Sequence, residues 1–253
     1  MNPTDLVLPP LESFDRTWPE VAENLACDEA LLVAAEDGGG PAFLRFWELD
    51  HPAIVLGASC RVGADVHLQA ARLDGVPIAR RSSGGGSVVI GPGALNVTVV
   101  LPIAADPAFA AVDVAQKTVL SRVAEGLRAF GPAVEVRGSG DLTLGSRKFS
   151  GSAQRRLRSM MMIHATLLYN FPLDRIDRYL PMPPRRPSYR ADRSHADFLT
   201  TIPLTREQLI SAISAKFSRT QNLFGERDPA LPLGRIEDLV AEKFSDPRWI
   251  ERL

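Results

Sequence analysis

Hydrophobic residues recur at helical spacing in several segments of the chain. Residues 20–35 place Val21, Leu25 and Leu32 on one side of a predicted helix. The strongest pattern spans residues 112–130, where one face carries Val112, Ala115, Val119, Val123, Leu127 and Phe130. Further helices are predicted over residues 65–73, 205–217 and 235–244, the second of them opened by a Thr205…Gln208 capping box.

Runs that favour β-strands lie between these helices. They cover residues 42–49, 53–56, 76–79, 95–101, 133–136, 141–144 and 160–169. Residues 1–20 are rich in proline and are expected to form a loose lead-in. Residues 21–253 show no linker or repeat and are expected to form one catalytic domain, without a C-terminal accessory domain. The helices gather in two places rather than alternating strictly with strands, which predicts an α+β fold.

The composition narrows the classes of function. The chain of 253 residues has 29 Lys and Arg against 30 Asp and Glu, so no basic excess suggests a nucleic-acid or membrane-surface partner. No apolar run is long enough to span a bilayer, and the N-terminus lacks the pattern of a signal peptide. The two cysteines, Cys27 and Cys60, are far apart, which fits a reducing cytoplasm rather than a disulfide framework.

The first candidate for chemistry is the segment Arg80-Arg-Ser-Ser-Gly-Gly-Gly-Ser-Val88. Three glycines allow close backbone approach to a ligand, and their N–H groups can form an anion-binding concavity. The preceding arginines supply fixed positive charge for a phosphate or carboxylate. The segment is not a Walker A loop or a dinucleotide fingerprint, because no Gly-Lys-Ser/Thr follows and the next element is a strand. A simple glycine hairpin remains the alternative.

The second candidate surrounds Lys148, within residues 141–156. Its ammonium could offset charge that develops on carboxyl and phosphoryl oxygens, and Asp141 could position it or help to hold a magnesium ion. The alternative is a solvated hairpin with a basic tip. His164 lies in an apolar strand and is interpreted as a hydrogen-bonded structural residue.

A long ordered loop is expected over residues 181–194, which hold several prolines and Arg185, Arg186, Arg190 and Arg193. Its arginines are either a docking surface for an acidic acceptor protein or a solvated loop.

Taken in order, several segments resemble the lipoate–protein ligase family, within the biotin/lipoate ligase superfamily. The resemblance rests on Asn24-Leu-Ala-Cys-Asp-Glu-Ala-Leu31, Leu44-Arg-Phe-Trp-Glu48, Ile54-Val-Leu-Gly57, Arg80–Val88, Gly93-Ala-Leu-Asn96, Gly140-Asp-Leu142, Arg147–Arg155 and His164-Ala-Thr-Leu-Leu168. It implies a central mixed, largely antiparallel sheet flanked by helices, similar to class II aminoacyl-tRNA synthetases and biotinyl protein ligases.

The same resemblance implies a reaction in two steps. Lipoic acid attacks the α-phosphate of ATP, with Mg²⁺, to give lipoyl-AMP and pyrophosphate. A lysine of an acceptor then attacks the mixed anhydride and forms an amide. The implied acceptors are the lipoyl domain of a 2-oxoacid dehydrogenase E2 subunit or the H protein of glycine cleavage. A separate accessory subunit could also be required.

The resemblance also implies roles for individual residues. Lys148 matches the family's catalytic lysine, and Asp141 matches the acidic position before it, with a further role as metal ligand. The acyl and adenylate pocket is expected to involve Arg80, Ser82, Ser83, Gly84, Gly85, Gly86, Asn96, Asp141, Ser150, Gly151 and Ser152.

Two other functions stay open. Octanoyltransferases of the same fold form a thioester on a cysteine and use no ATP, but neither Cys27 nor Cys60 lies where these relatives carry that cysteine. A degenerate, non-catalytic lipoyl-protein-binding module is the other alternative. Its marks would be Ile90 and Ser139, where the family's ligases often carry other residues.

Overall fold

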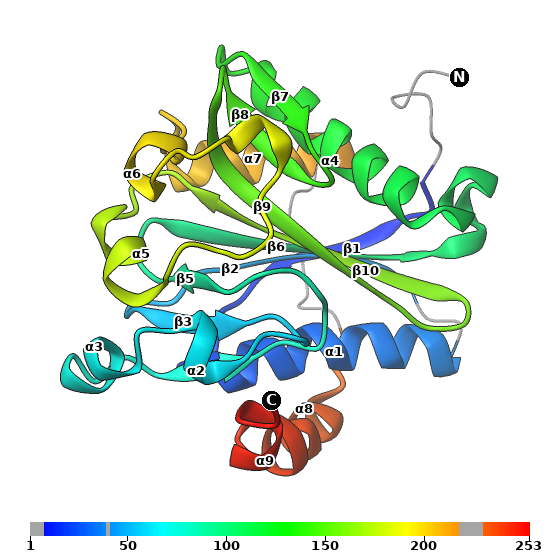
Figure 1. Ribbon diagram of the computed structural model, residues 1–253. Coiled ribbons are helices and arrows are strands. Elements are labelled where there is room, and N and C mark those ends of the chain that lie inside the picture. The colour runs from blue at the N-terminus through cyan, green and yellow to red at the C-terminus, as the bar shows by residue number, and fades with distance from the viewer. Residues whose placement is uncertain (1–7, 39–40, 218–229) are drawn as a thin grey trace.

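The computed structural model describes residues 8–38, 41–217 and 230–253. Its main element is a seven-stranded sheet in the order β1-β2-β6-β10-β9-β8-β7, in which β1 pairs with β2 in parallel and the other neighbours are antiparallel (Figure 1). In that order the strands span Leu11–Asp15, Ala42–Trp47, Ala94–Pro102, Met160–Leu168, Arg147–Arg156, Asp141–Leu144 and Val134–Arg137. The expected mixed, largely antiparallel architecture is therefore confirmed.

A smaller three-stranded sheet lies beside the large one, in the order β4-β3-β5. Its strands span Ile78–Arg80, Ala53–Leu56 and Val88–Ile90. The central strand β3 pairs with β4 in parallel and with β5 in antiparallel. The glycine segment connects β4 to β5, so both of its ends are anchored in this sheet.

Three long helices cover the large sheet: α1 (Val21–Gly38), α4 (Val112–Arg128) and α7 (Arg206–Phe217). Helices α4 and α7 lie on one face and α1 on the other (Figure 1). The shorter helices are α2 (Val62–Asp65), α3 (Leu68–Leu73), α5 (Asp174–Tyr179), α6 (His195–Phe198), α8 (Leu233–Leu239) and α9 (Pro247–Ile250); the 3₁₀ turns are η1 (Ile103–Ala105), η2 (Pro107–Ala110) and η3 (Ser188–Arg190), and η4 (Val240–Phe244) is a π-helical turn. No helix of the described segments is long and apolar enough to cross a membrane.

The helical periodicity predicted α1 and α4 closely, and the capping box at α7 is present. The backbone N–H of Gln208 donates to Thr205 Oγ1 at 3.3 Å, and the backbone N–H of Thr205 donates to Gln208 Oε1 at 2.9 Å. The helix predicted over residues 65–73 is instead two short helices, α2 and α3. The last predicted helix begins at Leu233 and ends in the π-helical turn η4.

Three strands, β1, β5 and β9, lie outside the predicted ranges. The expectation of a loose lead-in is wrong for residues 11–15, because β1 pairs with β2 throughout; residues 1–7 of that lead-in lie outside the described residues. Strand β9 escaped prediction because its sequence, RKFSGSAQRR, is polar and small. It lies inside the sheet between β10 and β8, where its backbone is paired on both sides.

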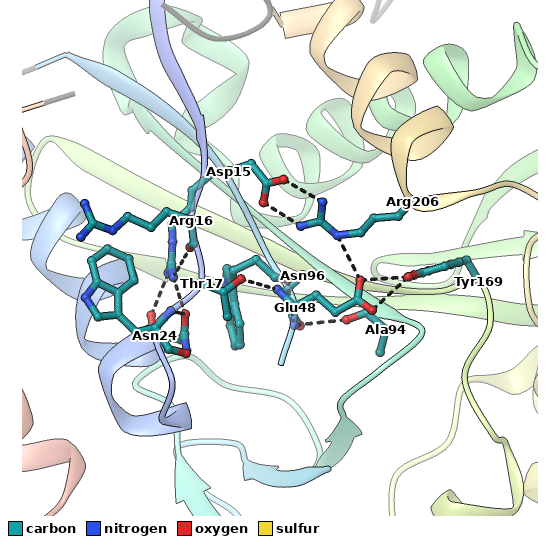
Figure 2. Close-up of polar contacts among 12 residues, drawn as sticks. Asp15, Arg16, Thr17, Asn24, Glu48, Ala94, Asn96, Tyr169 and Arg206 are labelled. Carbon is teal, nitrogen blue, oxygen red and sulfur yellow. Dashed lines mark hydrogen bonds and ion pairs between the residues drawn. The ribbon is translucent and has the colours of Figure 1, made fainter. Parts of the chain in front are cut away.

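A polar cluster fastens β1 to the rest of the fold (Figure 2). Arg206, at the start of α7, donates to both oxygens of Asp15 at 2.7 Å, and its Nε lies 3.4 Å from Glu48 Oε2. Tyr169, just after β10, donates its hydroxyl to Glu48 Oε1 at 2.9 Å. Burial and the Glu48 carboxylate raise the pKa of Tyr169 to about 12, so its hydroxyl remains a donor.

A buried ion pair joins α1 to the large sheet. Arg45 of β2 is fully buried and lies 2.5 Å from Asp28 of α1, whose other oxygen accepts from Thr98 at 2.8 Å. Arg45 also donates to the side chain and the carbonyl of Asn24. Burial raises the pKa of Asp28, and the neighbouring Arg45 opposes that shift.

The C-terminal segment is held by a second buried arginine. Arg80 is fully buried, and its donors bind the carbonyl oxygens of Gly57, Ala58, Cys60, Trp249 and Ile250. The Trp249 indole N–H donates back to the Arg80 carbonyl at 2.9 Å. The guanidinium therefore caps the end of α9 and ties it to the small sheet.

We expect Asp28→Asn to lower the free energy of unfolding by about 3–5 kcal/mol, because it leaves the Arg45 charge buried without a counter-charge. Urea denaturation would measure the loss. The control is Asp113→Asn, which removes an exposed pair with Lys117 on α4 and should cost at most about 0.5 kcal/mol. Equal shifts for the two variants would contradict the structural role of the buried pair.

We expect Arg80→Met to destabilise the protein by about 3 kcal/mol, because several buried carbonyl oxygens lose their donor. Thermal unfolding is the measurement. Arg248→Met is a matched control, because the Arg248 side chain is 91% exposed and its ion pair is with Asp246 of its own turn. If Arg80→Met unfolds at the same temperature as the control, the C-terminal segment does not depend on this arginine.

Candidate active site

A row of paired positions crosses the large sheet on the face turned away from α4. Asn96 pairs with Thr166, Thr166 with Gly151, and Gly151 with Asp141. The Thr166 hydroxyl donates to Asn96 Oδ1 at 2.7 Å, and the Asn96 side-chain nitrogen lies 3.4 Å from the Trp47 carbonyl oxygen. The same nitrogen lies 3.4 Å from the Ala94 carbonyl oxygen (Figure 2). The structure thus aligns three of the expected site residues, Asn96, Gly151 and Asp141, on one surface.

Lys148 reaches this surface because the pairing of β8 with β9 is irregular. Residues 148 and 151 are an odd number apart, so a regular strand would send their side chains to opposite faces. The register shifts between Leu142 and Thr143, and Phe149 is left without a partner on β8. Lys148 consequently lies beside Gly151, where an added Cβ would be 2.9 Å from its Nζ. A side chain at position 151 would therefore displace the end of the lysine from this position.

Asp141 holds the lysine from the adjacent strand. Its Oδ1 lies 2.6 Å from Lys148 Nζ, and its Oδ2 accepts from the Tyr189 hydroxyl at 2.7 Å. Both carboxylate oxygens are therefore engaged. Within the described segments no three His, Cys, Asp or Glu side chains are grouped so as to hold a metal ion. Asp141 thus contacts a lysine and a phenol, and its expected role as a metal ligand stays a prediction.

The glycine segment, residues 84–86 and called the glycine loop below, folds around the buried side chain of Arg81. The guanidinium donates to the carbonyl oxygens of Gly84 at 2.6 Å and Gly86 at 2.8 Å, and to Ser83 Oγ at 3.0 Å. Gly85 has φ +86°, and an added Cβ on Gly57 would lie 1.9 Å from the Gly85 carbonyl oxygen. Burial lowers the pKa of Arg81 to about 10, which leaves it charged at neutral pH.

Ser83 fastens this loop to the large sheet. Its hydroxyl lies 2.5 Å from His164 Nε2 in the centre of β10. Burial, together with the charge of Arg81, lowers the pKa of His164 to about 3, so the imidazole is neutral at physiological pH. The hydrogen bond expected for His164 is therefore present. Such a weakly basic imidazole is a poor general base for activating Ser83.

The glycine loop and Lys148 border the same stretch of β9. An added Cβ on Gly85 would lie 3.9 Å from Ala153 Cβ. Ala153 and Gly151 are two residues apart and share a face, at a Cα separation of about 6.6 Å. Gly84 and Gly86 are exposed, and the space where their Cβ atoms would lie is open. A ligand can therefore approach the loop backbone on the side that Lys148 also faces.

Several expected site residues lie elsewhere. Arg80 uses its donors on the carbonyl oxygens described above, so the expectation that it faces a bound anion is not met. Ser150 and Ser152 alternate with Gly151 and point toward the α4 side of the sheet, where Ser152 accepts from Gln116 at 2.7 Å. The polar sequence did not reveal which residues of β9 share a face. Ser82 is partly buried, and its carbonyl oxygen lies 3.5 Å from Arg155.

The structure adds charged residues that the motifs alone did not single out as site residues. Glu29 of α1 is almost fully buried and lies 3.1 Å from Arg155 of β9 and 2.7 Å from Lys243 of η4. Arg155 shares the face of Ala153 and Gly151. Glu29 and Arg155 occur within the motifs that carry the family resemblance, whereas no motif includes Lys243.

The two cysteines differ in their relation to the loop. Cys27 is fully buried in α1, and burial raises the pKa of its thiol to about 12. The Cys60 thiol, 7% exposed, donates to the Gly85 carbonyl oxygen at 3.4 Å. Neither thiol lies in the row of Asn96, Gly151 and Asp141.

Solved structures share this fold. The bipartite lipoate protein ligase of Thermoplasma acidophilum, studied with its E2 lipoyl domain, matches with a TM-score of 0.79 and 20% identity over 97% of each chain. A lipoate-protein ligase A bound with ATP matches with a TM-score of 0.75 and 21% identity over 98% of this chain and 100% of that chain. At these identities the likeness concerns the fold, and it agrees with the expected architecture.

Sequence relatives carry the names of two activities. A protein of Aeropyrum pernix, named provisionally as a lipoate-protein ligase A, is 36% identical over 155 residues, or 61% of this chain and 56% of that protein. An octanoyl-[GcvH]:protein N-octanoyltransferase of Geobacillus kaustophilus is 27% identical over 160 residues, or 60% of this chain and 56% of that protein. The alignment thus spans about half the length of these relatives.

A family model described as the lipoyl protein ligase A/B catalytic domain matches residues 20–218, which include the glycine loop, Asp141 and Lys148. The chain belongs to the lipoyl protein ligase A/B catalytic domain family.

Proposed function

We propose that the protein is a lipoate–protein ligase, which activates lipoate with ATP and transfers the lipoyl group to a lysine of a lipoyl domain or an H protein. The observation that carries the proposal is the placement of Lys148 beside Gly151, facing the same surface as the exposed glycine loop. One ammonium group and several backbone N–H groups then border a site where negative charge can develop.

The proposed chemistry uses these groups in a defined way. In the first step the lipoate carboxylate attacks the α-phosphate of ATP, and pyrophosphate leaves. The Lys148 ammonium would stabilise negative charge on the carboxyl and phosphoryl oxygens, and the Gly84–Gly86 backbone would bind an anionic group. In the second step the acceptor lysine attacks the acyl carbon and AMP leaves. Mg²⁺ would be bound through the phosphates of ATP, because Asp141 is already engaged.

The positions of the cysteines favour ligation over cysteine-dependent transfer. A nucleophilic cysteine needs a thiolate with access to the acyl carbon. Cys27 is buried with a raised pKa, which excludes it from that role. Cys60 is the only other cysteine of the chain, and its thiol donates a hydrogen bond to the Gly85 carbonyl oxygen. The octanoyltransferase among the relatives keeps the transferase as the second candidate, with Cys60 as its one available nucleophile.

The two candidates differ in their need for ATP. The purified chain would be incubated with an apo lipoyl domain, lipoate and Mg-ATP, and the acceptor would be weighed by intact mass spectrometry. We expect a lipoyl mass increment that requires ATP. Modification from octanoyl carrier protein without ATP would establish the transferase instead. If neither reaction occurs, even with a candidate accessory subunit, the chain is a binding module rather than an enzyme.

We expect Lys148→Ala to lower the rate of lipoyl transfer by roughly 100-fold to 1000-fold, because it removes the ammonium that stabilises charge in the transition state. The initial rate with saturating substrates is the measurement. Lys117→Ala is the control, because Lys117 is half exposed on α4 and away from the site. An active Lys148→Ala enzyme with an unchanged circular dichroism spectrum would refute the catalytic role.

We expect Cys60→Ser to keep at least about half of the ligase activity, because the serine hydroxyl can also donate to the Gly85 carbonyl oxygen. The same rate assay measures the effect, with unfolding temperature as a check on folding. A folded Cys60→Ser variant that transfers no acyl group would argue for a thioester intermediate, and hence for the transferase.

A further inference from the structure

Tyr189 connects the loop of residues 181–194 to the Lys148 site. Its hydroxyl donates to Asp141 Oδ2 at 2.7 Å, and Asp141 Oδ1 lies 2.6 Å from Lys148 Nζ. The phenol, the carboxylate and the ammonium therefore form a continuous chain of hydrogen bonds. Tyr189 is 48 residues from Asp141 in sequence, and no motif marks it.

We propose that Tyr189 is a positioning residue, which orients Lys148 by fixing the carboxylate of Asp141. The proposal rests on the proposed function, because it concerns the lysine that would serve acyl activation. The last torsion of an aspartate side chain is soft and roughly two-fold. A carboxylate bonded at one oxygen can rotate about that torsion, whereas one bonded at both oxygens is held.

The need for such a constraint follows from the lysine itself. Lys148 has a flexible four-carbon stem, is 26% exposed, and lies beside Gly151, whose lack of a side chain leaves space for movement. Lys148 forms an ion pair with Asp141, and displacement of a catalytic group by about 1 Å can cost roughly 100-fold in rate. Restricted rotation of the Asp141 carboxylate would therefore fix the position of the Lys148 ammonium.

Tyr189 is itself rigidly held. Its ring lies 5.4 Å from the Phe198 ring, centroid to centroid, and an added Cβ on Gly138 would lie 3.4 Å from its Cε1. Its carbonyl oxygen accepts from Arg193 at 2.6 Å, and Arg193 also donates to the Ser146 carbonyl oxygen at 3.0 Å in the turn between β8 and β9. The loop is thus tied to the same hairpin that carries Asp141 and Lys148.

Deprotonation of the phenol does not disrupt this contact at physiological pH. Burial and the adjacent Asp141 carboxylate raise the pKa of the Tyr189 phenol, so the hydroxyl donates throughout the physiological range. Tyr189 uses its hydroxyl on Asp141 rather than on a substrate. Its loss should therefore reduce kcat and leave KM for the acyl substrate unchanged.

The test compares Tyr189→Phe with Tyr179→Phe. Phenylalanine keeps the ring contacts of Tyr189 and removes only the donor. Tyr179 is a matched control, because its hydroxyl donates to the carboxylate of Asp74 at 2.8 Å outside the site. We expect Tyr189→Phe to lower kcat roughly tenfold with unchanged KM, and Tyr179→Phe to leave both constants unchanged.

A second measurement does not depend on activity. Trace acetylation with acetic anhydride, followed by peptide mass spectrometry, reports how fast Lys148 reacts relative to Lys117 in the same molecule. We expect faster labelling of Lys148 in Tyr189→Phe, because a rotating carboxylate holds the ammonium less well. Tyr179→Phe should label like the wild type.

Wild-type values for kcat and for Lys148 labelling in Tyr189→Phe would overturn the proposal. So would a rise in KM with unchanged labelling, because that pattern assigns Tyr189 to substrate contact. If the wild-type enzyme transfers no acyl group, the proposed function fails, and the labelling comparison alone then decides whether Tyr189 holds Lys148.

Discussion

The buried guanidinium groups of Arg45, Arg80 and Arg81 impose the main constraint on this structure. Removing a guanidinium from water is unfavourable unless acceptors replace the lost hydration. Arg45 meets this need with Asp28 and Asn24 of α1, Arg80 with carbonyl oxygens that include the end of α9, and Arg81 with the carbonyl oxygens of the glycine loop. Each arginine thereby fixes the position of a segment distant from its own strand or of a loop without regular structure.

The glycine loop shows how this constraint serves the site. Because Arg81 binds the loop carbonyl oxygens from inside, Gly84 and Gly86 stay exposed on the side of β9 that Lys148 also faces. The neutral His164 then connects Ser83 to the centre of the large sheet. A segment that composition alone describes as flexible is therefore a fixed backbone surface, as anion binding requires.

The extent of prediction from sequence differed between elements for physical reasons. Periodicity located α4, because this helix buries a stripe of apolar residues against the sheet, and a capping box marked the start of α7. Helix α1 was also predicted, although it buries residues on all of its sides between Asn24 and Leu32. Periodicity missed β9, whose stability comes from backbone pairing on both edges rather than from apolar side chains. The motifs selected Lys148, Asp141 and the glycine loop, and the structure brings these together. They did not select Tyr189, which reaches Asp141 only through the fold.

The sequence by itself determined the α+β class, the main helices and the family, because hydrophobic period, capping residues and ordered motifs are local properties of the chain. Tertiary structure alone decided which side chains share a face of the sheet and which arginines donate their hydrogen bonds to the protein's own backbone. A single shift in the pairing of β8 and β9 moves Lys148 to the side of Gly151 and leaves Ser150 and Ser152 on the other. Such a register shift depends on contacts between strands, so the pattern of residues along a single strand does not predict it.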